Sequence, residues 1–474
     1  MKKQLCLLSL IFLLLFIFPA ISTAKNDITG YWDGRIKILN LDLGFQLEVK
    51  KANGSLTAFL SIPKQGLKDY KLLVFQFNNP EVYFELPSPA GVAKFNGKLK
   101  ADSISGTIIQ AGIKGSFQLG KSTKPTIAMK EPEKTEPLPY LEEEIKFKDR
   151  NILLAGTLTH PKEDKKYPAI ILLSGSGPNT RDEEILGFKI FQKIADYFTK
   201  KGIVVLRYDK RGTGGSTGNI YEATTEDFTN DAIAAVDFLK KQPFVDEKKI
   251  GLLGHSEGGI EAPMAASISN DIAFIILMSG SGVNGGEIIL EQQKLNLKIA
   301  GASDYVIKGN EELQEKINNA LRDDKDLESI RNDLTDFEEK DFQNLSQDVK
   351  ASIQDKDAFI KSKVQTQITI FNSPWFRYFV KYDPIPALEN VKVPVLMTFG
   401  ELDMQVSVVQ NKTKMEEALK RGGNNNYKSI VFPKANHLYQ EAKTGSPNEY
   451  ADLPKEFVPG FLDTISEWIL GTAK

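Results

Sequence analysis

Apolar and polar residues alternate with a period of two over residues 28–119. In Gly44–Lys50, for example, every second residue is apolar. Such alternation is typical of a strand that buries one face. Turn-forming pairs, among them Asn53-Gly54 and Asn96-Gly97, separate the runs. The pattern therefore predicts a small antiparallel β domain over residues 25–120, either a barrel or a sandwich.

Residues 121–140 contain four prolines among charged residues and no apolar period, which is typical of a solvated linker. Beyond them, short apolar runs predict strands buried on both faces, and amphipathic stretches predict helices between the first four. This alternation predicts an α/β domain over residues 141–474, with a mostly parallel sheet flanked by helices. The apolar runs are Ala169–Leu173, Ile203–Leu206, Ile250–Leu253, Ile272–Met278 and Val395–Phe399, and the helical stretches are Phe188–Lys200, Asp227–Lys240 and Gly258–Ile268.

The alternation stops over about residues 284–389. Here the chain is polar and has the period of helices, as in Glu311–Arg322, without a buried strand. A structureless loop of this length would be unusual in a compact domain. We therefore expect a helical cap insertion over one end of the sheet.

The N-terminal 24 residues have the pattern of a signal peptide. Lys2 and Lys3 form a basic start, Leu5–Phe18 is almost entirely apolar, and Ser22-Thr23-Ala24 supplies small residues for cleavage. The apolar run is shorter than the ~20 residues of a membrane-spanning helix. We therefore expect cleavage after residues 1–24 and no membrane span afterwards, with an uncleaved membrane anchor as the alternative.

Cys6 is the only cysteine and lies within this segment, whereas Lys25 would begin the mature chain. A lipid anchor would need a cysteine there, so we expect a periplasmic or secreted protein that is not lipid-anchored. A mature chain without cysteine has no disulfide, no cysteine nucleophile and no thiolate metal site. The net charge of −2 and the pI near 6.1 do not point to nucleic acid as a partner.

The pentapeptide Gly254–Gly258 has the form G-x-S-x-G. It follows the apolar run that ends at Leu253 and precedes a helical stretch. In this context the motif places the serine hydroxyl on a sharp turn, and the glycines relieve crowding of the backbone. The N-terminus of the following helix favours negative charge. Ser256 is therefore the predicted nucleophile, and the alternative is a glycine-rich turn in a non-catalytic relative.

A serine nucleophile needs a base, and the chain contains three histidines. His437 lies in the loop after the last predicted strand, where a general base can exchange a proton with Ser256. His255 adjoins the serine, and we expect it to be a packing residue. His160 lies far upstream, near the edge of the sheet. His437 is therefore the predicted base.

The acid that orients this base should lie between the serine and the histidine in chain order. Asp403 stands just beyond the apolar run Val395–Phe399, and ligand-binding residues collect at the carboxyl ends of such strands. Asp403 would hold the imidazole tautomer and stabilise its protonated form. Glu401, in the same loop, is the alternative acid.

The loop Ser174–Pro178, with the sequence SGSGP, follows the first buried strand. Its small residues allow close approach of a substrate, so the amides of Ser176 and Glu257 would form an oxyanion hole. A phosphate-binding loop is the rival interpretation, but the Lys-Ser/Thr ending of such loops is missing. A second glycine-rich run, Asp209–Ser216, matches no dinucleotide-binding pattern, and we expect a structural loop beside the site.

Together these motifs resemble the α/β-hydrolase superfamily, and within it the bacterial serine carboxylesterases with an SGSGP oxyanion loop and a GHSEGG nucleophile elbow. The resemblance covers about residues 141–473. It includes Ser373–Phe379, where Trp375 and Tyr378 would line the acyl or alcohol pocket, with simple cap packing as an equal alternative. The resemblance implies the α/β-hydrolase fold, carboxylesterase activity on a small-molecule ester, and no need for a metal or an organic cofactor.

Two other functions remain open. Related families use the same triad to cleave amides, so a serine peptidase of the aminopeptidase type is the first alternative. A pair of carboxylates that binds a free amine would favour it, and Glu261, Glu287 and Glu291 are the candidates. A non-catalytic binding protein that acts through its β domain is the second alternative.

Overall fold

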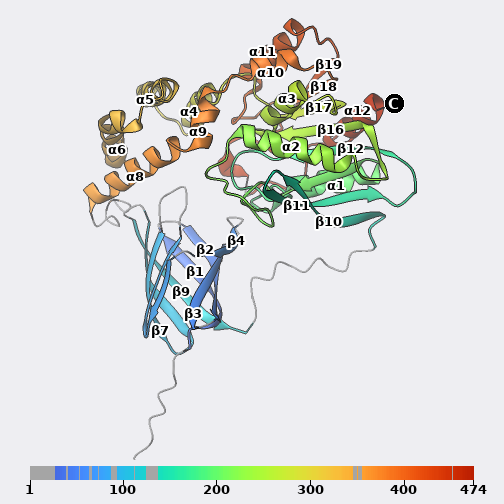
Figure 1. The fold of residues 1–474 in the computed structure, drawn as a ribbon. Coiled ribbons are helices and arrows are strands. Elements are labelled where there is room, and N and C mark those ends of the chain that lie inside the picture. The colour runs from blue at the N-terminus through green and yellow to red at the C-terminus, as the bar shows by residue number, and fades with distance from the viewer. Residues whose placement is uncertain are drawn as a thin grey trace, which may run out of the picture.

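The computed structural model describes a large part of the chain (Figure 1). The predicted signal peptide and most of the predicted linker lie outside the described residues. Within the described ranges, none of the helices combines the length and apolarity needed to cross a membrane. The described residues are 27–38, 41–52, 54–62, 67–72, 74–86, 93–110, 113–123, 137–344, 350, 355–450 and 452–473.

The first body is a nine-stranded sheet in which every pair of neighbours is antiparallel. The strand order is β4-β3-β2-β1-β9-β8-β7-β6-β5. Every second side chain is buried, most regularly in the strands Glu81–Leu86 and Ala93–Lys100, which agrees with the predicted period of two. The strands are β1 (Gly30–Ile38), β2 (Leu41–Ala52), β3 (Ser55–Ile62), β4 (Leu67–Lys71), β5 (Val74–Asn78), β6 (Glu81–Leu86), β7 (Ala93–Lys100), β8 (Ser103–Gln110) and β9 (Ile113–Ser122).

One predicted turn in this sheet is wrong. Asn96 and Gly97 lie in the middle of β7, where Gly97 is paired with Gly106 of β8. A Cβ atom at Gly97 would lie 2.8 Å from the ring of Phe117. Glycine is therefore needed here to make room for an aromatic core residue, and packing outweighs the turn preference of the pair.

The ends of the predicted linker are also wrong by a few residues. Ser122 is still paired with Tyr31 in the first sheet, and Tyr140 is already paired with Pro161 in the second. The two strands that contain these residues extend into the proline-rich segment, because both residues pair with a neighbouring strand.

The second body contains a mixed eight-stranded sheet, which confirms the predicted α/β class. Its order is β10-β11-β15-β12-β16-β17-β18-β19. Strands β10 and β11 are antiparallel to their neighbours, and the other six strands are parallel. The strands are β10 (Tyr140–Asp149), β11 (Ile152–Pro161), β12 (Tyr167–Leu173), β15 (Val204–Tyr208), β16 (Val245–His255), β17 (Phe274–Met278), β18 (Val395–Gly400) and β19 (Tyr427–Phe432).

Helices cover both faces of this sheet. One face packs against α2 (Thr225–Leu239), α3 (Gly258–Ile268), α10 (Ile385–Asn390) and α11 (Val408–Arg421). The other packs against α1 (Ile190–Lys200) and α12 (Phe461–Thr472). We predicted that the first helix starts at Phe188, but Phe188–Lys189 (β14) pairs with Glu184–Ile185 (β13), so the helix begins two residues later.

A group of helices interrupts the second body between β17 and α10. Figure 1 shows these helices in yellow and orange, outside the sheet and its covering helices. They enclose an apolar core of their own, which includes Leu321, Leu334, Phe359 and Val364. The helices are α4 (Gly285–Ile299), α5 (Asp304–Arg322), η2 (Leu327–Ile330), α6 (Arg331–Asn344), α8 (Lys356–Phe371) and α9 (Pro374–Lys381).

Candidate active site

Ser256 lies on the turn between β16 and α3. Its φ of +54° is a left-handed conformation that a serine rarely adopts. The turn is tight, because a Cβ atom at Gly254 would lie 1.9 Å from the carbonyl oxygen of Gly258, and one at Gly258 would lie 2.1 Å from that of Leu173. Ser256 is partly exposed, whereas the residues on either side are buried. The sharp turn therefore presents the serine to solvent.

The structure brings Asp403 and His437 into direct contact. They follow the neighbouring parallel strands β18 and β19, and the Nδ1 atom of His437 lies 2.9 Å from the Oδ2 atom of Asp403. The Oδ1 atom of Asp403 accepts the amides of Gln405 and Val406, each at 2.8 Å. Burial alone would raise the pKa of Asp403, but the charge and hydrogen bond of His437, with the amide of Val406, lower it. Glu401 instead accepts the amide of Lys434 at 2.8 Å.

His255 connects the turn of Ser256 with the loop of His437. The two histidine rings lie 4.7 Å apart, and the Nε2 atom of His255 is 3.0 Å from the carbonyl oxygen of His437. Its Nδ1 atom is 3.0 Å from the Oε1 atom of Glu183. We predicted only packing for His255, and this is wrong because both ring nitrogens have polar partners. Glu183 was missed altogether, since no sequence motif marks it.

The SGSGP loop lies against the turn of Ser256. A Cβ atom at Gly175 would lie 3.3 Å from that of Ser256. The amide of Gly175 donates to Glu183 at 2.6 Å, and its carbonyl oxygen accepts from the Nζ atom of Lys210 at 2.8 Å. Ser176 is exposed beside it. Both backbone groups of Gly175 are thus fixed immediately before Ser176.

A buried charge cluster lies beneath this turn. The Nζ atom of Lys210 is 2.8 Å from the Oε2 atom of Glu257 and 3.5 Å from the Oε1 atom of Glu261. These three residues expose 3% or less of their surface. Burial raises the pKa of Glu261 to about 8, and the charge of Glu257 contributes, although Lys210 opposes the shift. The side chains of Glu257 and Lys210 thus have structural partners that no sequence motif marks.

The cap reaches this cluster through α9. The Nε1 atom of Trp375 donates to the Oε1 atom of Glu257 at 2.6 Å, and Thr225 donates to the same oxygen at 2.8 Å. The indole ring stacks on Phe379, with ring centroids 5.1 Å apart. Tyr378 stacks on Tyr382 at 5.5 Å, and burial raises the pKa of Tyr378 to about 12. Trp375 therefore lies beside the turn of Ser256.

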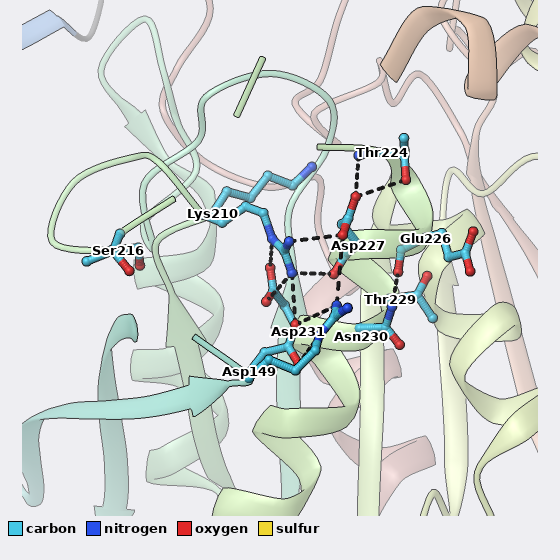
Figure 2. A network of polar contacts seen from close by, with 12 residues as sticks. Asp149, Lys210, Ser216, Thr224, Glu226, Asp227, Thr229, Asn230 and Asp231 are labelled. Atoms are coloured by element: carbon cyan, nitrogen blue, oxygen red, sulfur yellow. Dashed lines mark hydrogen bonds and ion pairs between the residues drawn. The ribbon is translucent and has the colours of Figure 1, made fainter. Parts of the chain in front are cut away.

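The run Asp209–Ser216 organises a separate network. Arg211 donates to Asp231, Asp149 and Asp227 at 2.7, 3.0 and 3.1 Å. Figure 2 shows how these three carboxylates converge from β10 and α2. Burial raises the pKa of Asp231 to about 6, against the opposing effect of Arg211. These ion pairs hold Arg211, and with it the neighbouring Lys210, in a fixed position.

No group of three or more potential metal ligands occurs among the residues that the structure describes. The arrangement consists of a partly exposed serine on a strained turn, a buried Asp–His pair and a loop of small residues.

Two curated relatives are similar to this chain. Esterase EstD of Thermotoga maritima is 27% identical over 349 residues, which are 72% of either chain. Dipeptidyl-peptidase 5 of Porphyromonas gingivalis is 24% identical over 299 residues, which are 62% of this chain and 34% of that protein. This chain therefore matches about a third of the peptidase.

Solved structures with a similar arrangement include an α/β-hydrolase from Penicillium sp. sh18, with 18% identity and a TM-score of 0.43 over 70% of this chain and 98% of that one. An esterase of Pyrococcus furiosus has 17% identity and a TM-score of 0.40 over 62% of this chain and 84% of that one.

The family model described as X-Pro dipeptidyl-peptidase (S15 family) matches residues 132–439. This match spans more than half of the 474 residues and contains the turn of Ser256, the loop of Asp403 and His437. The chain belongs to the X-Pro dipeptidyl-peptidase (S15) family.

Proposed function

We propose that this protein is an exported serine hydrolase that cleaves carboxylic esters through an acyl-enzyme intermediate. Ser256 is the nucleophile, His437 the general base and Asp403 the orienting acid. The contact of 2.9 Å between His437 and Asp403, in a loop that His255 joins to the strained turn of Ser256, is the observation that best supports this function. Export rests on the N-terminal sequence alone, and the only partner proposed is a small-molecule ester.

In the proposed reaction, His437 takes the proton of the Ser256 hydroxyl while its oxygen attacks the ester carbonyl. The protonated imidazole is stabilised by Asp403, and it returns the proton to the departing alcohol. Water then attacks the acyl-enzyme, with His437 again accepting a proton, and the carboxylic acid is released. Asp403 is suited to this role because its lowered pKa keeps it ionised.

The amides of Ser176 and Glu257 are the proposed oxyanion donors. Gly175 is fixed at both its amide and its carbonyl, which orients the following peptide. Glu257 precedes α3, where amides point out of the helix and favour negative charge. Loss of one such donor typically slows acyl transfer by about 100-fold or more.

Trp375 and Tyr378 are the proposed contacts for the acyl or alcohol group. The hydrogen bond between Trp375 and Glu257 brings α9 to the residue after the nucleophile, which supports this placement. A substrate that reaches Ser256 would then meet the aromatic side chains of α9.

A serine peptidase is the second candidate, and two observations favour it. The family model carries a peptidase description, and Dipeptidyl-peptidase 5 is one of the relatives. Two of the three carboxylates that could bind a free amine argue the other way, because each has a basic partner. Glu261 is buried against Lys210, and Glu287 is 3.2 Å from Lys414. The similarity to Esterase EstD over most of both chains also supports the ester.

A binding function inside the nine-stranded sheet has less support. The rings of Phe45, Phe84, Phe95 and Phe117 pack together in its interior, with centroids 4.4–6.1 Å apart. Because aromatic side chains pack this interior, we place the proposed hydrolysis in the second body.

The deciding experiment compares a short-chain nitrophenyl ester with a dipeptidyl anilide that carries proline next to the scissile bond. We expect rapid ester hydrolysis, little anilide hydrolysis, and loss of both in Ser256→Ala. Ser267→Ala is the matched control and should keep wild-type activity, because Ser267 lies near the far end of α3 and its hydroxyl donates to the carbonyl oxygen of Met264. Faster anilide cleavage would establish the peptidase, and full activity in Ser256→Ala would overturn the mechanism.

A further inference from the structure

His255 is a fully buried side chain that the proposed reaction does not use. Its two ring nitrogens contact two different loops, each at 3.0 Å. One contact is to Glu183, in the segment between β12 and α1. The other is to the carbonyl oxygen of His437, after β19. Two loops that are distant in sequence are therefore held by one imidazole ring.

Both partners of the ring are acceptors. A carbonyl oxygen cannot donate a hydrogen bond, so the Nε2 atom of His255 must carry a proton. The Oε1 atom of Glu183 already accepts the amide of Gly175 at 2.6 Å, as expected for a carboxylate. A neutral imidazole has a single N–H group and would leave one of these contacts without a hydrogen. With an ionised Glu183, both contacts are hydrogen bonds only when the ring is an imidazolium, in which both nitrogens donate.

The surrounding charges agree with this assignment. Burial alone would lower the pKa of His255, but the charge and hydrogen bond of Glu183 outweigh it and the pKa is raised. Asp403 contributes in the same direction, and the ring of His437 is the neighbouring titratable group. The ammonium group of Lys210 interacts electrostatically with Glu183, and it donates to the carbonyl oxygen of Gly175.

We propose that Glu183 and His255 form a buried ion pair that ties the SGSGP loop to the loop of His437, and that His255 is a positioning residue for the reaction at Ser256. The inference rests on the proposed function, because it assumes that Ser256 and His437 carry the chemistry. Glu183 fixes the amide of Gly175, next to the proposed oxyanion donor of Ser176. His255 fixes the carbonyl of the base itself. One pair thereby sets the distance between the oxyanion donors and the base.

The protonation of His255 can be measured without any substrate. The chain has three histidines, so selective ¹⁵N labelling gives six ring-nitrogen signals, assigned with His160→Gln and His255→Gln. We expect both nitrogens of His255 to be protonated at neutral pH in the full-length protein. In Glu183→Gln, which keeps an acceptor oxygen but loses the charge, one nitrogen should become unprotonated. An unprotonated nitrogen in the wild type, or two protonated ones in Glu183→Gln, would overturn the ion pair.

The positioning role is tested by ester kinetics. His255→Gln keeps a donor for the His437 carbonyl, whereas His255→Asn keeps one for Glu183. Because each loses one of the two links, we expect kcat to fall by about 10- to 100-fold in either variant with KM little changed. His160→Gln is the matched control, since His160 also lies between a glutamate and a carbonyl but belongs to β11. Its kcat should equal that of the wild type.

The measurements distinguish the ion pair, the positioning role of His255 and the proposed function from one another. If Ser256→Ala remains active while His255 is doubly protonated, the ion pair stands and the function is wrong. Unchanged kcat in folded His255→Gln and His255→Asn refutes the positioning role. If these variants do not fold, Glu183→Gln supplies the kinetic test with the same expected loss, because it keeps an acceptor oxygen for the amide of Gly175 but loses the charge that holds the second proton on His255.

Discussion

Trp375 donates its indole N–H to the carboxylate of Glu257, 2.6 Å away, and so joins the cap to the residue that follows Ser256. The two residues are 118 positions apart in the chain. Glu257 also binds Lys210, which in turn binds the carbonyl of Gly175. The cap, the turn of Ser256 and the SGSGP loop are therefore parts of one hydrogen-bonded unit.

Trp375→Phe tests this unit. The phenyl ring keeps the stacking on Phe379 but cannot donate to Glu257, and a hydrogen bond to a charged group is worth about 1.5–3 kcal/mol. We expect the free energy of unfolding to fall by about that amount, and kcat/KM for esters to fall as well, because the cap is no longer fixed to the turn. Chemical denaturation and ester kinetics measure the two effects.

Trp468→Phe is the control for this change. Trp468 packs against Phe274 on the opposite face of the sheet, so its replacement can lower stability without altering kcat/KM. Equal losses of kcat/KM in both variants would show that Trp375 acts only through general stability.

Asp403→Asn should separate the two candidate acids. An asparagine cannot stabilise the protonated imidazole and favours the wrong tautomer of His437, so we expect kcat to fall by about 10⁴-fold. Glu401→Gln should keep nearly full activity, because Glu401 binds the amide of Lys434 and not the histidine. Both values come from steady-state kinetics on the same nitrophenyl ester. A larger loss in Glu401→Gln than in Asp403→Asn would reverse the assignment.

The sequence was most informative where function depends on topology. Asp403 and His437 were predicted because parallel strands end at one edge of a sheet, and β18 and β19 are neighbours there. The contacts of His255 were not predictable, since they join segments 72 and 182 residues away. At Gly97 the local sequence favoured a turn, but the structure places this glycine within β7, where it packs against the ring of Phe117. Local patterns thus predicted the elements, and long-range polar contacts needed the structure.

Arg211→Met should destabilise the fold more than the reaction. Asp149, Asp227 and Asp231 would remain close together without their shared cation, and breaking a buried ion pair costs about 3–5 kcal/mol. We expect a loss of this size in the free energy of unfolding, measured in urea. Arg150→Met is the control, because Arg150 is 63% exposed and its contact with Asp149 contributes little. Equal stability of the two variants would contradict the structural role of the network.

Glu261→Gln should change how stability depends on pH. Burial raises the pKa of Glu261 to about 8, whereas in the unfolded chain it stays near the ordinary value of 4.5. Between these two values the folded protein binds one more proton than the unfolded chain, so this group lowers stability as pH rises from about 4.5 to 8. Glutamine cannot ionise and removes that slope. We therefore expect the stability of Glu261→Gln relative to the wild type to increase from pH 5 to pH 8, measured by urea denaturation at each pH. Glu339→Gln, at an exposed position of α6, should follow the wild type throughout. A constant difference between Glu261→Gln and the wild type over this range would show that Glu261 does not titrate there.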